Sequence, residues 1–212
     1  MTRRRLPGIG RRDGSRGQSL VEFSMLVPVF LLILLGVLEF GFVFDEQMTI
    51  TYATREGARS GSAFANGNTT SMPCATSVDV DKYIVAAVQR VLEGPGSRIA
   101  ISRVSEIRIY NANSAGNQIG TQANIWTPAN DAGPVVDGQP LDWNVTTSGW
   151  NACTRVNTWV GTTPPNSIGV SIRYRYNYVT PLASIIGFFG SSTNTGLDIN
   201  DRSVMALNPS ND

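Results

Sequence analysis

The chain has 212 residues, of which 42% are hydrophobic and 16% are charged, a low charged fraction for a soluble cytosolic protein. The sequence has no histidine, which excludes histidine general bases, Ser-His and Cys-His nucleophile pairs, and histidine metal ligands. The net charge of +1 hides an asymmetry, because residues 1–17 contain six Arg and one Asp. The basic charge therefore lies on a tail rather than on a folded domain, and we expect no nucleic-acid partner.

The first 44 residues have the pattern of a basic leader followed by a membrane helix. Residues 1–17 are rich in Gly and Arg and are typical of the cytoplasmic side of a membrane segment. The run from Phe23 to Phe44 contains 22 residues with Glu39 as its one charge. As a helix it is roughly 33 Å long, which matches a bilayer core. It is longer than the apolar part of a secretory signal and lacks an A-x-A site, so we expect a retained, single-pass segment in the cytoplasmic membrane, with the N-terminus inside.

Helical spacing continues past this run to about residue 64. Four residues spaced by four, called here the aromatic row, lie on one helical face: Phe40, Phe44, Met48 and Tyr52. A second set, the small row, follows at the same spacing: Ala53, Gly57, Gly61 and Ala65. Small side chains let another backbone approach closely, so we predict that the small row packs against the chain's own domain or a neighbouring helix. We therefore expect one nearly continuous helix over residues 18–64.

The remainder of the chain predicts a small domain outside the cytoplasm. An amphipathic helix is expected over residues 79–93, and alternating apolar and polar residues predict strands over 98–110, 168–179 and 197–207. Residues 111–166 are rich in Asn, Thr, Gly and Pro, and we expect long loops with short strands there. The predicted fold class is α+β, with a leader (1–17), a long helix (18–65), and a domain (66–212) that packs one helix on an antiparallel sheet.

The two cysteines, Cys74 and Cys153, both fall in the part expected outside the cytoplasm. In that compartment an even pair favours a disulfide over two free thiols. Two thiols alone make a poor metal site, so we expect neither a metal nor a cofactor.

All four tryptophans fall in the loop-rich stretch: Trp126, Trp143, Trp150 and Trp159. If exposed, they are suited to stack on sugars or a partner protein. If buried, they supply the core that a loop-rich segment needs, and we favour this interpretation.

The most informative motif is Gly17-Gln18-Ser19-Leu20-Val21-Glu22-Phe23, which opens the apolar helix directly after the basic leader. It resembles the type IV prepilin processing motif, in which a membrane peptidase cuts after the glycine. The resemblance implies that Gly17 ends the leader and that Gln18 becomes the new N-terminus. A charge on Glu22 just inside the apolar zone needs a partner. The family's assembly logic supplies the freed amino group of Gln18, in the same or a neighbouring subunit; an ordinary residue at a membrane boundary is the alternative.

A longer segment, Gln18 to Ser62, resembles the TadE-like pseudopilins of the tight-adherence (Tad) pilus system. The matching pieces are GQSLVEF, the early Pro28, LGVLEFG around Glu39, and TREGARSG from Thr54 to Gly61. The resemblance implies a minor pilin or pseudopilin that acts in pilus assembly, adhesion or secretion. Its implied partners are membrane lipid, a prepilin peptidase, other pilin-like subunits and the pilus assembly machinery.

Several residues of this helix have a simpler interpretation beside the assembly role. Pro28 is commonly a kink in a membrane helix. Glu39 either faces a packed partner or the outer interface, or makes an assembly contact. Glu56 and Arg59 form an ordinary i,i+3 surface pair, whereas Arg55 repels Arg59 at i,i+4, which mildly favours an outside partner for the two arginines.

Three functions compete at this point. The first is the pilin-like subunit, located in the membrane or in a surface pilus. The second is a membrane-tethered binding domain with an uncleaved signal anchor and no filament role. The third, a tethered hydrolase, requires an acid pair or a nucleophile with its base; the sequence has no such motif, so we expect no enzyme. The mass of the mature N-terminus distinguishes the first from the second.

Overall fold

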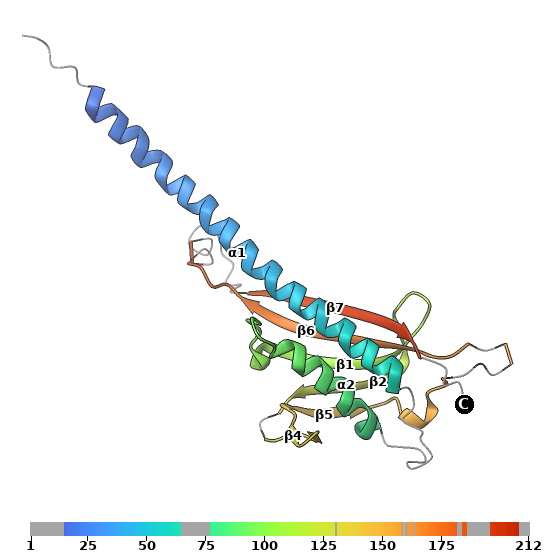
Figure 1. Cartoon of the computed structure of the whole chain (residues 1–212). Helices are drawn as coiled ribbons and strands as arrows, with labels where there is room; N and C mark the ends of the chain where they lie inside the picture. The colour runs from blue at the N-terminus through green and yellow to red at the C-terminus, as the bar shows by residue number, and fades with distance from the viewer. Residues whose placement is uncertain are drawn as a thin grey trace, which may run out of the picture.

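The computed structural model describes residues 15–64, 77–129, 131–157, 159, 161–162, 164–181, 184–185 and 196–207. Its longest element is α1 (Ser15–Phe64), a helix of 50 residues that includes Pro28. At 1.5 Å per residue this helix is about 75 Å long. Its N-terminal half projects away from the domain, and its C-terminal half lies along it (Figure 1). The predicted long helix is confirmed, and by length and composition it qualifies as a membrane span.

The domain is built on an antiparallel sheet. Within the described residues, five strands pair in the order β5-β2-β1-β6-β7. Their bounds are Trp143–Ser148 for β5, Gln118–Pro128 for β2, Val104–Ala112 for β1, Ser167–Asn177 for β6 and Gly196–Ala206 for β7. A short hairpin pairs β3 (Val135–Val136) with β4 (Gln139–Pro140), and two short 3-10 helices precede β1 (η1, Ile101–Arg103) and β6 (η2, Ala152–Thr154).

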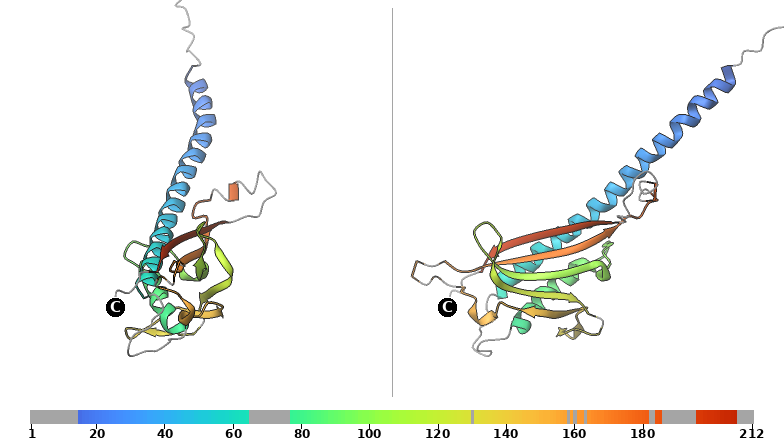
Figure 2. Two further views of the ribbon diagram at one scale, coloured as in Figure 1. Left: turned by 90° about the vertical axis from the view of Figure 1, so that its right-hand side faces the viewer. Right: turned by 180° about the vertical axis from the view of Figure 1, so that it is seen from behind.

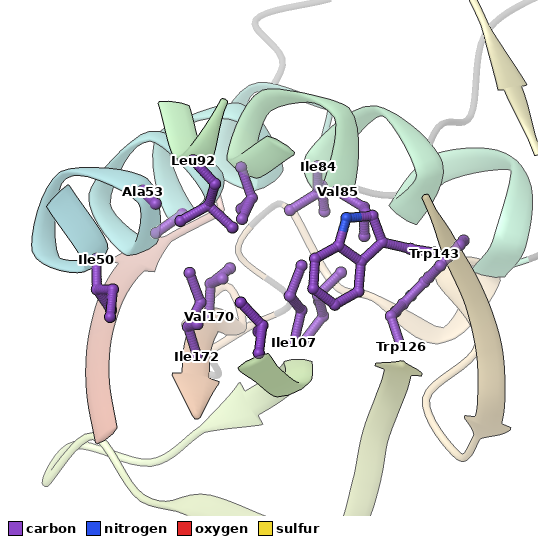
Figure 3. Packing of buried hydrophobic residues seen from close by; sticks show 14 of the residues in the cluster. Ile50, Ala53, Ile84, Val85, Leu92, Ile107, Trp126, Trp143, Val170 and Ile172 are labelled. Carbon is purple, nitrogen blue, oxygen red and sulfur yellow. The ribbon is translucent and has the colours of Figure 1, made fainter. Parts of the chain in front are cut away.

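One face of the sheet is covered by α1 together with α2 (Ser77–Leu92) (Figures 1 and 2). The core lies between these layers, as the close view in Figure 3 shows. Alternation along β6 explains why that strand contributes so much to it. Every second residue is buried, in the order Ile168, Val170, Ile172, Tyr174 and Tyr176. The predicted α+β architecture, with a helix on an antiparallel sheet, is therefore confirmed.

The small row is where α1 comes closest to the domain. A Cβ atom added at Gly57 would lie 2.6 Å from Val88 Cγ2 and 3.1 Å from Val170 Cγ1. One added at Gly61 would lie 2.6 Å from Ile168 Cδ1. The small row thus packs against the chain's own α2 and β6, the first of the two partners expected for it. Ala65, its last member, lies outside the described residues.

The loop-rich interpretation of residues 111–166 is wrong in one important part, because β2 is eleven residues long and pairs with both β1 and β5. Its sequence, QIGTQANIWTP, has few apolar residues and a glycine, which hid the strand pattern. The strand expected from residue 98 begins only at Val104, after η1. Trp126, Trp143 and Trp150 are buried as favoured, whereas Trp159 is 65% exposed.

A buried polar network joins α2 to the segment after η2. Arg155 Nη2 lies 2.7 Å from Asp81 Oδ1, and both side chains are buried. Asn124 donates to Asp81 Oδ2 at 2.6 Å and exchanges two hydrogen bonds with the backbone of Trp150. Burial raises the pKa of the Asp81 carboxyl, while Arg155 and Asn124 act in the opposite direction. Removing Asp81 or Arg155 alone would leave the other buried charge without compensation, so this ion pair fixes how the two segments meet.

The network also bears on the cysteines. Cys153 lies in η2, two residues before Arg155, and Cys74 lies seven residues before Asp81 in sequence. Cys74 lies outside the described residues, so the disulfide stays a prediction. The ion pair joins α2, which follows Cys74 in sequence, to the segment just after Cys153.

We predict that alkylation of the intact protein without reductant labels neither cysteine and that reduction exposes both. Closing a loop of about 80 residues would stabilise the domain by roughly 4–5 kcal/mol in the chain-entropy model, less any strain. Mass spectrometry counts the labelled thiols, and the midpoint of thermal unfolding with and without reductant reports the stability. Two thiols that react before reduction would show that the bond is absent.

We further predict that Gly57→Leu destabilises the domain by about 1–3 kcal/mol or more, because the added side chain overlaps Val88 and Val170. Membrane insertion should be unchanged, since the substitution adds apolar surface. The matched control is Gly41→Leu, where no heavy atom lies within 4 Å of an added Cβ. Thermal unfolding in detergent, with membrane fractionation alongside, tests both variants; equal unfolding midpoints for the two would contradict the close packing.

Candidate functional site

The N-terminal turns of α1 present an apolar surface that the chain's own domain leaves exposed. Leu20, Val21 and Phe23 are all exposed, and the exposed apolar surface continues through Phe40. Gln18 donates from Nε2 to Glu22 Oε1 at 3.0 Å. Glu22 is therefore hydrogen-bonded within its own helix, on a surface suited to lipid or to other helices. Its proposed pairing with a freed amine of Gln18 stays a prediction.

Glu39 marks the point at which α1 meets the domain. Its side chain is 3% exposed although it belongs to the apolar run. One carboxylate oxygen accepts hydrogen bonds from the Tyr176 hydroxyl and from the Val179 backbone N–H at 2.9 Å. The other accepts from the Thr180 backbone N–H at 2.8 Å. The packed partner expected for Glu39 is therefore the chain's own domain, at the end of β6; we call this set of contacts the Glu39 junction.

The tyrosine of the Glu39 junction is suited to its role as donor. Burial and the neighbouring carboxylate of Glu39 raise the pKa of Tyr176. Its hydroxyl therefore stays protonated and donates to the carboxylate. Tyr178 packs edge-on against the Tyr176 ring, with centroids 5.9 Å apart, which holds the strand end in place.

Charged and aromatic groups lie next to the Glu39 junction, about one to two turns further along α1. The guanidinium of Arg98 lies 4.4 Å from the centroid of the Phe42 ring, a cation–π contact. Glu46 is buried and feels the charges of Arg98 and Arg103. Burial, with Glu46 as the second cause, raises the pKa of Tyr174 to about 12.

The small row belongs to the face of α1 that meets the domain, but the part of this face nearer the N-terminus has no such row in the sequence. The buried residues recur at steps of seven, four or three, which keeps one stripe of the helix on the domain: Glu39, Glu46, Ile50, Ala53, Gly57 and Gly61. Glu39 and Glu46 are polar, so a search for apolar periodicity passes over them. Glu46 lies seven residues after Glu39 and seven residues before Ala53. This spacing of two helical turns was the signal that the sequence offered for a shared face.

The aromatic row lies on a different face and stays exposed. Phe40 and Phe44 stack on each other with ring centroids 6.1 Å apart. Beyond them a shallow hollow of about 240 Å³ is lined by Phe44, Gln47, Met48, Thr51, Tyr52 and Arg55. This face of α1 is available to another molecule.

Of the remaining predicted residues, Glu56 and Arg59 form the expected ion pair, with Oε1 and Nη2 2.6 Å apart. Arg59 is largely exposed, so the pair contributes little to stability. Arg55 is exposed and lines the hollow on the aromatic row.

We predict that Glu39→Ala loosens the end of β6 from α1. The cost is about 1–3 kcal/mol for the buried Tyr176 hydroxyl and less for the two partly buried backbone N–H groups. Hydrogen exchange at the amides of Val179 and Thr180 measures this directly, and both should exchange faster in the variant. Glu56→Ala, which removes an exposed pair on the same helix, should leave these amides unchanged. Wild-type protection in Glu39→Ala would show that the carboxylate does not hold this segment.

A family of known proteins matches most of α1, and the match does not extend into the domain. The family model described as TadE-like protein matches residues 17–59. No curated protein and no solved structure matches the chain. The matched stretch begins at Gly17 and ends at Arg59, so it covers most of α1 and stops before α2 and the sheet. Residues 17–59 are therefore similar to the TadE-like family, as the motifs of the N-terminal helix predicted.

Proposed function

We propose that this chain is a minor pilin or pseudopilin that acts in the assembly of a Tad-type pilus for adhesion or secretion. The observation that carries the proposal is the TadE-like segment of residues 17–59 on a helix whose apolar half extends beyond the domain. A structural subunit, rather than an enzyme, is consistent with this design. The TadE-like match supports a pilus-associated role in general, and the filament assignment is our inference from the helix.

In this proposal α1 has two tasks. Its first half crosses the cytoplasmic membrane, with the basic leader inside and the domain outside, because arginines before the span favour that orientation. Its second half is held by the domain on one face only. The exposed aromatic row remains for contact with other pilin-like subunits. Glu22, exposed near the start of the span, has the position to attract a partner amine.

Processing is the first step that the proposal requires. A prepilin peptidase would cut between Gly17 and Gln18, and an added Cβ at Gly17 meets no heavy atom of the described residues within 4 Å. A variant at this position therefore tests the peptidase and not the fold. We predict that Gly17→Leu accumulates as the uncut precursor, that Gly17→Ala is cut more slowly, and that the wild-type chain begins at Gln18.

Intact mass spectrometry of membrane-extracted protein measures all three. Gly36→Leu is the matched control, because Gly36 also lies in α1 with no heavy atom near an added Cβ, and it should be cut normally. A wild-type protein that retains residues up to Gly17 would contradict the proposal. It would favour a tethered binding domain with an uncleaved signal anchor.

A further inference from the structure

The Glu39 junction places part of the folded domain at the depth of the apolar run. Glu39 lies five residues before Phe44, the end of that run, which is roughly 7–8 Å along the helix axis. Because the N–H groups of Val179 and Thr180 bond to the Glu39 carboxylate, their backbone lies at the same level. A domain attached only by the far end of α1 would have no such contact.

The chemistry of this segment suits a region with little water. Backbone N–H groups at membrane depth must be satisfied internally, and those of Val179 and Thr180 are, by one carboxylate. The carboxylate in turn gains three donors, which offset the cost of a charge near lipid. The Val179 side chain is 55% exposed, although it is apolar. In sequence, residues 181–190 (PLASIIGFFG) contain no charge.

A cation lies at the next level along the helix. Arg98 is exposed, and its guanidinium lies against the ring of Phe42, three residues beyond Glu39. Three residues correspond to about 4.5 Å further from the membrane centre. Glu46 is buried and interacts electrostatically with Arg98 and Arg103, whereas Arg98 is exposed. Along the helix axis, the apolar side chain of Val179 comes first and the Arg98 cation follows. A bilayer leaflet has the same order, with acyl chains followed by phosphates.

We propose that this end of the domain is a lipid-binding surface. Val179 enters the boundary between acyl chains and headgroups on the outer side of the membrane, and Arg98 binds the phosphates of anionic lipids. The domain is thereby held against the bilayer at the Glu39 junction and does not move freely on its helix. The proposal depends on α1 as the membrane helix, which it shares with the proposed function, and not on processing or pilus assembly.

The test uses the full-length chain in vesicles of phosphatidylcholine brominated near the headgroup end of its acyl chains, with and without phosphatidylglycerol. Bromine quenches tryptophan only at close range. Val179→Trp should therefore lose emission that the wild-type tryptophans keep. The matched control is Val135→Trp, because Val135 is similarly exposed (58%). Its neighbour Val136 lines a groove together with Glu56 and Arg59, which lie further along α1 than Glu39. It should be quenched no more than the wild-type chain.

Phe30→Trp, in the middle of the apolar run, tests the membrane helix separately from the lipid-binding surface. If Phe30→Trp is quenched by lipid brominated deep in the acyl chains but Val179→Trp and Val135→Trp behave alike, α1 spans the membrane and the lipid-binding surface is refuted. If Phe30→Trp is not quenched either, the membrane helix itself is refuted, and this proposal with it.

The role of Arg98 is tested in the Val179→Trp background. Adding phosphatidylglycerol should increase quenching, and Arg98→Gln should abolish that increase. Arg90→Gln, at an exposed arginine near the end of α2, should retain it. Equal responses of the two arginine variants would overturn the headgroup contact.

Discussion

The structure depends on a change of environment within one helix, and the Glu39 carboxylate is where the change occurs. Before Glu39, most of the large apolar side chains of α1 are exposed, and none of those described is buried. After it, the same helix contributes Ile50, Ala53 and Ala58 to the core. A buried carboxylate requires donors, and Tyr176 of β6 and the backbone of Val179 and Thr180 just after it supply them. The register of the whole domain on α1 therefore follows from this contact and from the close approach at Gly57 and Gly61.

These two contacts complement each other physically. The glycine contacts are non-directional, and they let α2 and β6 come close to the backbone of α1 over several turns. The Glu39 junction is directional and fixes where along the helix the domain begins. Thr54 adds a third point, because its hydroxyl donates to Asp201 of β7 at 2.7 Å. Helix and domain thus behave as one body from Glu39 onwards, and the free part of the molecule is the apolar half of α1.

The sequence predicted the elements whose periodicity is strong, and it missed those defined by long-range polar contacts. The long helix, α2, β6 and β7 all have clear apolar patterns, and they appear within a few residues of their expected bounds. β2 was missed because its few apolar residues, such as Ala123 and Trp126, are diluted by polar ones, and its pairing with β1 and β5 decides its state. Glu39 was recognised as unusual, but its partners lie about 140 residues away in sequence, a separation that no local pattern reveals.

We propose that α1 keeps one face for its own domain and another for neighbouring subunits. Photo-crosslinking in membranes tests it most directly, with a photoreactive residue in place of Phe44, which is exposed, or Val43, which packs on the core. We predict crosslinks to other pilin-like subunits from position 44 and crosslinks only within the chain from position 43. Crosslinks between subunits from neither position would contradict the assembly role and would leave a domain tethered to the membrane by its helix.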